Sequence, residues 1–518
     1  MNNETYKFEL SRNTRIVVFA VSLFTLFIHL YSNLFANYGI FRDEFYYLAC
    51  TNRLSAGYVD QPPLSIYLLA VSKFMFGNSL FAIRLLPAFT AAVTVNLTGL
   101  LTARIGGGTF AVLTACVTLA LSPIFLAIST FFSMNIFDHF FWVLSAYLVV
   151  KIIRENKSFN WILLGVTLGL GMLNKISMIW FGAGFAAGLL ISPYRTHLKT
   201  KWPYVVALIA FLIFSPYIIW NITHDFAHLE FIRNATRYKY NTVTPLDFIG
   251  GQLLLPGPAA ILIWLPGLIY LLIGKSVKNF RILALIFLTT FIILIINWHS
   301  KPEYLAPAYP LILVGGGLFF EMIFKGKSFG WVKYAVISFI VLTGIAVVPL
   351  ALPLLPVETF ISYSQFIGVG QQNSENKEMG KLPQFYADMF GWEELAKDVS
   401  DVYTALPDSE KAGTVVFADN YGEAGALEYY ASRYKLPDVI CPHNSYWFWS
   451  DPDNRKIKTI IFLGGNIEGH KSICKDITLA AIHEVSYSMP YENNLPIYIC
   501  RDIYRSLKEM WRQVRFYI

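Results

Sequence analysis

The sequence predicts a polytopic α-helical membrane protein that ends in a small α/β domain, and three observations support this fold class. Of the 518 residues, 55% are hydrophobic and only 14% are charged, and the mean hydropathy is +0.49. A soluble domain usually carries about a quarter charged residues. Apolar runs long enough to form membrane helices recur along the first two thirds of the chain, and charged residues return in the last third.

A membrane helix needs about 20 mostly apolar residues, and about eleven segments are candidates. The first follows Arg12 and Arg15 and exceeds the core of a cleavable signal peptide, which is about 7–15 residues long. We therefore expect a retained first span. The predicted spans are 16–37, 82–103, 109–129, 136–150, 159–174, 176–192, 203–221, 250–273, 281–298, 304–324 and 332–352.

The distribution of Lys and Arg predicts the orientation, because short cytoplasmic loops are rich in basic residues. With a cytoplasmic N-terminus, each loop on that side carries at least one basic residue, as Lys151 and Arg154 show. These loops account for the formal charge of +7 without a nucleic-acid partner. We expect a multi-pass protein of the inner (plasma) membrane with an extracytoplasmic C-terminal domain.

The predicted domains are a membrane module over 1–352, with outer loops at 38–81 and 222–249, and an extracytoplasmic α/β domain over 353–518. In this last domain, TVVFA and KTIIF predict buried strands over 414–418 and 458–462, and a helix is expected over 422–430. Three cysteines of the domain allow one disulfide in an oxidising compartment, and the sequence does not select the pair from Cys441, Cys474 and Cys500.

Two adjacent carboxylates, Asp43 and Glu44, open the first outer loop. A carboxylate near the membrane interface can take a proton from an acceptor hydroxyl or amine as a general base. An ordinary acidic pair in the first turn of a helix explains the same pattern, because negative charge suits the helix dipole. A third acid, Asp138, lies where an apolar stretch begins, and the alternatives there are again a functional acid and a helix-start residue.

A second motif of the first outer loop, YVDQPPL at 58–64, holds Asp60 at a turn fixed by two prolines. The alternative is a cap for an interfacial helix over 64–76. In the second long loop, His224 and His228 are four residues apart and would share a helix face, so they are candidate ligands of a divalent metal.

Basic residues also occur on the predicted outer side, against the usual bias. Together with acidic and aromatic neighbours they suggest a site for anionic groups, with phosphate as the natural ligand. Binding to lipid headgroups is the competing explanation. These residues are Arg42, Arg53, Arg84, Lys175, Arg233, Arg237, Lys239 and Lys301.

Taken together, these motifs resemble the GT-C superfamily of glycosyltransferases. The resemblance is to the bacterial branch of the dolichyl-phosphate-mannose–protein mannosyltransferase family, which includes the aminoarabinose transferases that act on lipid A. The segments that carry it are RDEFYYLAC at 42–50, YVDQPPL at 58–64, the Asp138 segment ending in Phe141-Trp142, GMLNK at 171–175, KPEYLAPAYP at 301–310 and NYGEAGALEYY at 420–430.

The resemblance implies an inverting transfer of a sugar from a polyprenyl-phosphate carrier to an extracytoplasmic acceptor, which is lipid A, another glycolipid, a glycan or a protein. It implies that Asp43 is the general base, that Glu44 positions it or shares its catalytic role, and that Asp138 lies near the site. Asp60 and His228, rather than His224, would hold a divalent metal, although the lipid A branch prefers Glu at the position of Asp60. Substrate contacts are expected from Tyr46, Tyr58, Arg84, Lys175, Lys301 and Tyr304.

Two other functional classes remain open. A membrane transporter or lipid flippase predicts ionisable residues near mid-bilayer and a pseudo-symmetric repeat of broken helices. A receptor would use the spans only as an anchor and bind its ligand with the tail. The sequence contains no HExxH, P-loop or GxSxG motif, so it gives no support to a hydrolase or a nucleotide-driven enzyme.

Overall fold

The computed structural model describes residues 9–36, 38–326, 330–370, 377–450, 457–504 and 507–518, and the chain divides into two compact units. A helical unit extends to Ala36 and includes Gly77–Ile219 and Thr242–Pro356. A mixed unit combines segments 37–76, Trp220–Asn241 and Val357–Ile518. The mixed unit therefore joins the C-terminal third of the chain to most of the two long outer loops.

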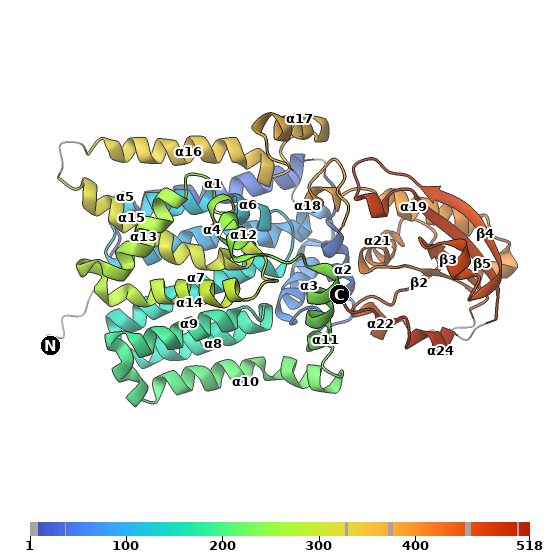
Figure 1. Cartoon of the computed structure of the whole chain (residues 1–518), viewed down its shortest axis with the longest axis horizontal. Coiled ribbons are helices and arrows are strands. Elements are labelled where there is room, and N and C mark those ends of the chain that lie inside the picture. The colour runs from blue at the N-terminus through green and yellow to red at the C-terminus, as the bar shows by residue number, and fades with distance from the viewer. Residues whose placement is uncertain (1–8, 37, 327–329, 371–376, 451–456, 505–506) are drawn as a thin grey trace. The chain divides into compact units, whose positions relative to one another are not determined.

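In the helical unit the long helices run side by side (Figure 1). α13 and α15 pack so closely that a Cβ at Gly267 would collide with the backbone of Ile312 and Gly316. The helices are α1 (Arg12–Phe35), α4 (Leu80–Ile105), α5 (Thr109–Ala120), α6 (Pro123–Ile128), α7 (Met134–Glu155), α8 (Ser158–Asn174), α9 (Met178–Ile191), η1 (Pro193–Lys199), α10 (Trp202–Thr223), α12 (Pro245–Leu254), α13 (Ile261–Ile273), η3 (Lys275–Phe280), α14 (Arg281–Ile296), η4 (Pro302–Ala308), α15 (Tyr309–Phe324) and α16 (Val332–Ala351).

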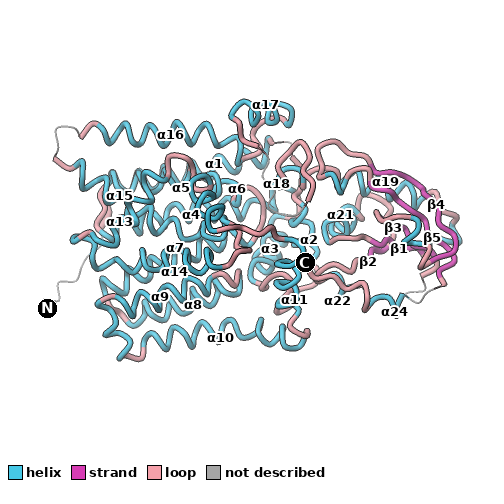
Figure 2. The backbone as a smooth tube through the Cα atoms, in the orientation of Figure 1, coloured by secondary structure: helices cyan, strands magenta, loops and turns pink. Residues whose placement is uncertain are grey.

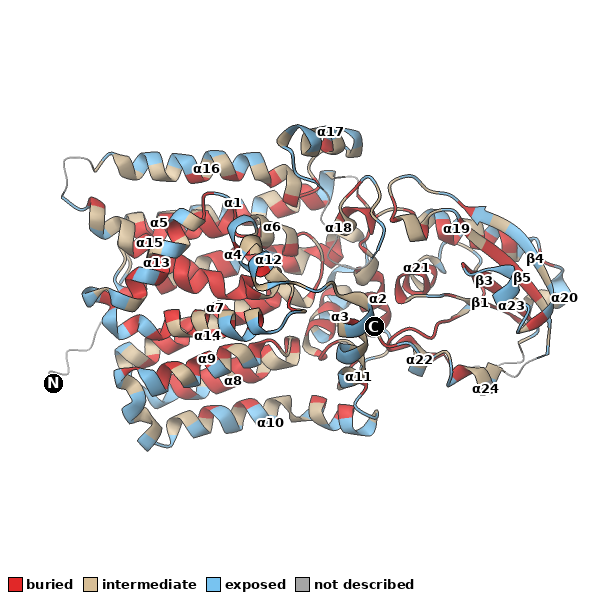
Figure 3. Cartoon of the chain, in the orientation of Figure 1, coloured by how far each residue is buried: buried red, intermediate tan, exposed pale blue. Residues whose placement is uncertain are grey.

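The burial pattern of this unit is that of a protein in lipid. On α1 the buried residues are mostly polar, including Thr25 and His29, whereas Phe19 is 66% exposed and Phe27 is 64% exposed. An apolar outer face is stable where hydrocarbon replaces water. Figure 3 shows α7 and α15 largely buried and α10 and α16 largely exposed or half-buried. The chain is therefore a multi-pass membrane protein with central and peripheral helices.

Among the described residues, seven of the eleven predicted spans coincide with helices long and apolar enough to cross a membrane. The other four fall on shorter helices, and proline or glycine interrupts two of these four segments. Segment 109–129 breaks between α5 and α6, where Pro123 begins the second helix. Segment 250–273 breaks at Pro256-Gly257-Pro258, where Gly257 has φ +112°.

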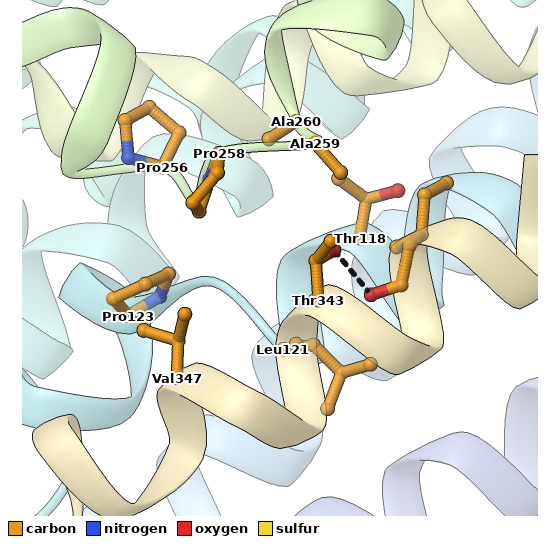
Figure 4. Close-up of a pocket in the computed structure, with 12 residues that line it drawn as sticks. Thr118, Leu121, Pro123, Pro256, Pro258, Ala259, Ala260, Thr343 and Val347 are labelled. Carbon is orange, nitrogen blue, oxygen red and sulfur yellow. Dashed lines mark hydrogen bonds between the residues drawn. The ribbon is translucent and has the colours of Figure 1, made fainter. Parts of the chain in front are cut away.

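The proline breaks line a small cavity in the helical unit (Figure 4). Its volume is about 20 Å³, close to the space one water molecule occupies. Pro123, Pro256 and Pro258 surround it together with Thr118, Thr343 and Val347. Since no charged residue lines this cavity, it does not provide acid–base chemistry.

The mixed unit holds a five-stranded sheet, whose strands are the magenta tube segments in Figure 2. The strand order is β2-β1-β3-β5-β4; β1 pairs in parallel with β2 and β3, and the other pairs are antiparallel. The predicted strands over 414–418 and 458–462 and the helix between them are confirmed. The strands are β1 (Thr414–Phe417), β2 (Asp438–Ile440), β3 (Thr459–Leu463), β4 (Cys474–His483) and β5 (Leu495–Ile503).

Short helices surround this sheet or belong to the outer-loop segments of the mixed unit. The expected helix over 64–76 is present as α3. The helical elements are α2 (Arg42–Thr51), α3 (Leu64–Phe76), α11 (Ala227–Asn234), the π-helical turn η2 (Ala235–Lys239), α17 (Val357–Ile367), α18 (Gln384–Ala387), α19 (Trp392–Thr404), α20 (Asp408–Lys411), α21 (Tyr421–Tyr430), α22 (Tyr446–Trp449), α23 (Ile467–His470), η6 (Pro490–Glu492) and α24 (Leu507–Trp511).

A disulfide joins Cys474 on β4 to Cys500 on β5, with the two Cα atoms 5.9 Å apart. Cys441 is a buried free thiol. The structure thus selects one pair from the three cysteines that the sequence left open. The bond closes a loop of 26 residues and, by chain entropy, stabilises the fold by about 3 kcal/mol.

The first outer loop packs against the tail through α2 and α21. Two glycines of α21 make this approach possible. A Cβ at Gly425 would lie 2.8 Å from the carbonyl carbon of Phe45, and a Cβ at Gly422 would collide with the side chain of Arg42. Because the helix backbones touch here, α21 places the side chains of its first turn beside Asp43.

Candidate active site

Asp43 occupies the first turn of α2, in the mixed unit. Its side chain is 33% exposed. The hydroxyl of Tyr421 donates to Asp43 Oδ1 at 2.9 Å, and Arg42 Nε lies 3.6 Å from the same oxygen. Asp43 is therefore held by one oxygen while it remains accessible, as a general base must be.

Glu44 has a different position from its neighbour. It is fully buried, and its Oε2 accepts a hydrogen bond from the backbone N–H of Phe41 at 2.8 Å. This is the glutamate half of a capping box at the start of α2. The contact gives Glu44 a structural role: it fixes the helix turn that carries Asp43.

Asp60 is hydrogen-bonded to Tyr46, the first tyrosine of the FYY segment. The buried Tyr46 hydroxyl donates to Asp60 Oδ1 at 2.8 Å and also hydrogen-bonds with Ser445 Oγ at 2.8 Å. Ser445 Oγ in turn accepts from the Val59 N–H at 3.1 Å. Burial raises the pKa of Asp60 to about 6, although the hydrogen bond from Tyr46 lowers it.

The side chain of Tyr58 lies at the C-terminal end of α2. Its hydroxyl lies 3.2 Å from the carbonyl oxygens of both Cys50 and Arg53, and the residue is 1% exposed. The Cys50 carbonyl belongs to the C-terminal turn of α2, where intrahelical hydrogen bonds end, and Arg53 lies two residues beyond the helix. The observed contacts of Tyr58 are structural, and its expected substrate contact stays a prediction.

His228 contacts Val59, the residue that precedes Asp60 in the sequence. Its Nδ1 donates to the carbonyl oxygen of Val59 at 2.9 Å. Burial lowers the pKa of His228, so its ring is neutral near pH 7. A neutral histidine with Nδ1 held by a carbonyl is the usual form of an Nε2 metal ligand.

The described part of the chain contains no group of three or more His, Cys, Asp and Glu residues placed to hold a metal ion. Asp60 and His228 therefore offer at most two protein ligands. Such a pair fits a divalent cation that takes its other ligands from water and substrate phosphate. His224 instead hydrogen-bonds through Nδ1 to the Trp220 carbonyl at 2.8 Å and stacks on the indole.

Within the helical unit, Asp138 and Lys175 form a second cluster. Asp138, on α7, is fully buried and its Oδ2 accepts from the Ser177 hydroxyl at 2.9 Å. Lys175 Nζ lies 3.8 Å from the same oxygen and donates to Asn135 Oδ1 at 2.8 Å. Asp138 thus supplies the negative charge that a half-buried lysine needs.

An aromatic ring completes this cluster. Lys175 Nζ lies 5.5 Å from the centre of the Tyr304 ring, and Tyr304 follows Lys301 by one turn of η4. The structure thus brings together Lys175, Tyr304 and Asp138, whose roles at a phosphate site stay predictions. Arg84 lies in α4 of the same unit and is 1% exposed, and Asn33 Nδ2 donates to its backbone carbonyl.

Several residues of the tail share the site with Asp43 and were not assigned roles from the sequence. Arg42 reaches two of them: Nη1 donates to the Tyr491 hydroxyl at 2.7 Å, and Nη2 lies 3.6 Å from Asp388 Oδ2. Tyr421 and Ser445 contact Asp43 and Tyr46, as described above. The segment NYGEAGALEYY was the one available signal, because it contains Tyr421 and both packing glycines.

The side-chain amide of Asn420 bridges two buried acids, Glu423 and Glu492. Asn420 Nδ2 donates to Glu423 Oε1 at 2.9 Å and to Glu492 Oε1 at 3.1 Å. Burial raises the pKa of Glu492 to about 7, and burial and the neighbouring Glu492 raise the pKa of Glu423. One proton shared by the pair removes most of their repulsion.

Known proteins resemble the chain in sequence and in fold. The sequence model of the dolichyl-phosphate-mannose-protein mannosyltransferase family matches residues 60–220. ArnT from Cupriavidus metallidurans bound to undecaprenyl phosphate superposes with a TM-score of 0.62 at 10% identity, over 94% of this chain and 98% of that chain. The apo state of that protein gives a TM-score of 0.62 at 9% identity, over 94% and 97%.

A more distant structure is that of the archaeal oligosaccharyltransferase AglB from Archaeoglobus fulgidus, with a TM-score of 0.47 at 13% identity, over 85% of this chain and 69% of that chain. The search of curated proteins found no match. At 9–10% identity the likeness to ArnT establishes the fold. The chain has the GT-C fold, with a polytopic helical bundle and a C-terminal domain that contains a small sheet.

Proposed function

Because the chain has the GT-C fold, we propose that the protein is an integral-membrane inverting glycosyltransferase. It moves a sugar from a polyprenyl phosphate to an extracytoplasmic acceptor, and Asp43 is the general base. The observation that carries this proposal is the state of Asp43: a partly exposed carboxylate with one oxygen fixed by Tyr421 and Arg42. The matching ArnT structure, which contains undecaprenyl phosphate, supports the donor class.

The proposed reaction is a single displacement. The acceptor hydroxyl or amine attacks the anomeric carbon while Asp43 takes its proton, and the bond between that carbon and the phosphate oxygen breaks. The polyprenyl phosphate leaves as an anion, the configuration of the anomeric carbon inverts, and Asp43 returns its proton to solvent. No covalent enzyme intermediate is required.

Lys175 is the proposed phosphate-binding cation, assisted by Lys301 and by Tyr304. Asp138, Asn135 and Tyr304 surround its ammonium group and fix its direction. A positive charge held in advance stabilises the negative charge that grows on the leaving phosphate. Asp138 is thus proposed to act through Lys175 rather than as a base.

Asp60 and His228 are the proposed ligands of a divalent cation that is shared with the donor. Such a cation would neutralise phosphate charge. Tyr46 and the Val59 carbonyl orient the two side chains for this role. Lipid A, another glycolipid, a glycan and a protein remain the candidate acceptors.

The proposed localisation is the inner membrane, with the tail on the extracytoplasmic side. The Cys474–Cys500 disulfide supports this orientation, because structural disulfides persist in oxidising compartments. The phosphorylated lipid carriers bound by proteins of this fold also lie in the membrane, which suits the lipid-facing helical unit.

A transfer assay tests the proposal. Purified protein in lipid nanodiscs is incubated with undecaprenyl-phosphate sugars (mannose, glucose, galactose, arabinose and aminoarabinose) and with total envelope lipid or protein. Release of undecaprenyl phosphate and labelling of an acceptor are measured by mass spectrometry. We expect one donor to be consumed in the presence of one acceptor fraction.

The variant Asp43→Asn should lower kcat about 100- to 10,000-fold with unchanged donor binding, since the amide cannot accept the proton. Asp247→Asn is the matched control, because Asp247 is also an acid in the first turn of a helix. Full activity of Asp43→Asn would refute the assigned base. Movement of intact donor across the bilayer without cleavage would instead identify a flippase.

A further inference from the structure

The hydroxyl of Tyr421 is the tail's contact with Asp43, and it is firmly held. Tyr421 is 8% exposed, and its ring lies 4.9 Å from that of Tyr46 and 4.7 Å from that of His443. The Arg42 guanidinium lies 5.6 Å from the same ring. The phenol therefore has three planar neighbours that restrict its rotation.

The backbone of Tyr421 is fixed as well. Its N–H donates to His443 Nδ1 at 3.4 Å, and His443 Nε2 donates to the carbonyl oxygen of Ile518 at 3.0 Å. Burial lowers the pKa of His443 to about 3, so the ring stays neutral and keeps Nδ1 as an acceptor. Asn420 caps α21 by accepting from the N–H groups of Gly422 and Glu423.

These contacts act on one oxygen of Asp43. Tyr421 and Arg42 both face Oδ1, at 2.9 Å and 3.6 Å. In the part of the chain that the structure describes, Oδ2 has no hydrogen-bond partner, and the side chain is 33% exposed. An arrangement of this kind separates the oxygen that is anchored from the oxygen that is available to accept a proton.

We propose that Tyr421 is a positioning residue for Asp43: by donating to Oδ1 it fixes the carboxylate so that Oδ2 receives the acceptor's proton. The C-terminal domain thereby forms part of the active site, since it supplies this tyrosine. The inference rests on the proposed function in taking Asp43 as the base. It adds a residue on which the rate of transfer depends.

The test is Tyr421→Phe, which keeps the ring and its contacts and removes only the hydroxyl. With the undecaprenyl-phosphate sugar that the wild-type protein consumes, kcat should fall about 10- to 100-fold, because a hydrogen bond to a charged group is lost. The KM for the donor should stay within about twofold. The melting temperature shows whether the variant is folded.

The matched control is Tyr434→Phe, in which another tail tyrosine loses a hydrogen bond to a carboxylate, here Glu393 at 3.0 Å. Its kcat should remain that of the wild type. A purely structural role for Tyr421 would lower the melting temperature and leave kcat per folded molecule unchanged, and this result would overturn the proposal.

A second measurement needs no turnover. Carbodiimide labelling of Asp43, followed by mass spectrometry, should be at least about twofold faster in Tyr421→Phe, because the carboxyl group loses its anchor. Equal labelling rates would refute the positioning role. An unchanged kcat in Asp43→Asn would refute the proposed base instead. The failure of the positioning role and the failure of the proposed function are therefore distinguishable.

Discussion

Asp43 in the mixed unit and Asp138 in the helical unit are both acids near a helix start, yet their surroundings differ. Asp43 is 33% exposed and is held by a tyrosine and an arginine. Asp138 is fully buried and is held by Ser177 and Lys175. An exposed carboxylate can exchange a proton with a bound acceptor, whereas a buried carboxylate beside a lysine serves to balance and direct that cation.

The comparison also separates two kinds of support. The partners of Asp138 lie on neighbouring helical segments of the same unit, since Lys175 and Ser177 follow it by 37 and 39 residues. Residues far away in sequence support Asp43, because Tyr421 and Asp388 come from the tail. The predicted base therefore depends on the folding of the C-terminal domain, and the predicted phosphate cluster depends on packing between helices within the helical unit.

The largest effect is expected from Asp138→Ala. Removing one partner of a buried ion pair leaves Lys175 with an uncompensated charge, and the cost is about 3–5 kcal/mol. Thermal unfolding in nanodiscs should show this loss, whereas Ser177→Ala should cost only about 1 kcal/mol. Equal melting temperatures for Asp138→Ala and wild type would show that Asp138 does not balance Lys175.

Lys175→Met should weaken binding of undecaprenyl phosphate about 10- to 100-fold, because the phosphate loses a charged donor. Lys201→Met is the control, since Lys201 also lies beside an aromatic ring, with Nζ 5.1 Å from that of Trp202. Binding is measured by isothermal titration calorimetry. Unchanged affinity in Lys175→Met would remove this lysine from the phosphate site.

The metal site proposed for Asp60 and His228 can be tested by titration with Mn²⁺. If Asp60 and His228 hold a divalent cation, His228→Ala should weaken Mn²⁺ binding by roughly tenfold. His224→Ala should not, because His224 is bound to the Trp220 carbonyl and indole. The quenching of tryptophan fluorescence by Mn²⁺ provides the titration, and equal curves for both variants would contradict the assignment.

The smallest effect is a pH dependence of stability. Burial raises the pKa of Glu492 to about 7 from its ordinary 4.5, so the folded protein binds this proton more tightly than the unfolded chain. The free energy of unfolding therefore falls as pH rises from about 4.5 to about 7. Glu492→Gln should be more stable than wild type at pH 8 by about 1–2 kcal/mol and equal to it near pH 4.5.

Melting curves at pH 4.5, 6 and 8 measure this difference. Glu468→Gln is the control, because Glu468 is 81% exposed and forms a surface pair with Lys471. A pH-independent shift in Glu492→Gln would mean that the buried acid does not titrate in this interval.

The helical unit could be predicted from the sequence because the bilayer imposes a simple rule on length and hydropathy. Seven of the predicted spans are long helices, and two of the four shorter ones break at Pro123 or Pro256. Only the family resemblance suggested that Asp138, Lys175 and Tyr304 belong to one site, and their roles stay predictions. Each of these residues lies at the end of an apolar segment or just beyond it.

Tertiary structure alone decided how the tail takes part. Composition marked 353–518 as a folded region, but no local pattern indicates that Tyr421 reaches Asp43 or that Cys474 pairs with Cys500. Contacts of this kind depend on close packing between segments hundreds of residues apart, such as the approach of Gly425 to Phe45. Sequence periodicity reports which face of an element is buried, and only the fold determines which partner covers it.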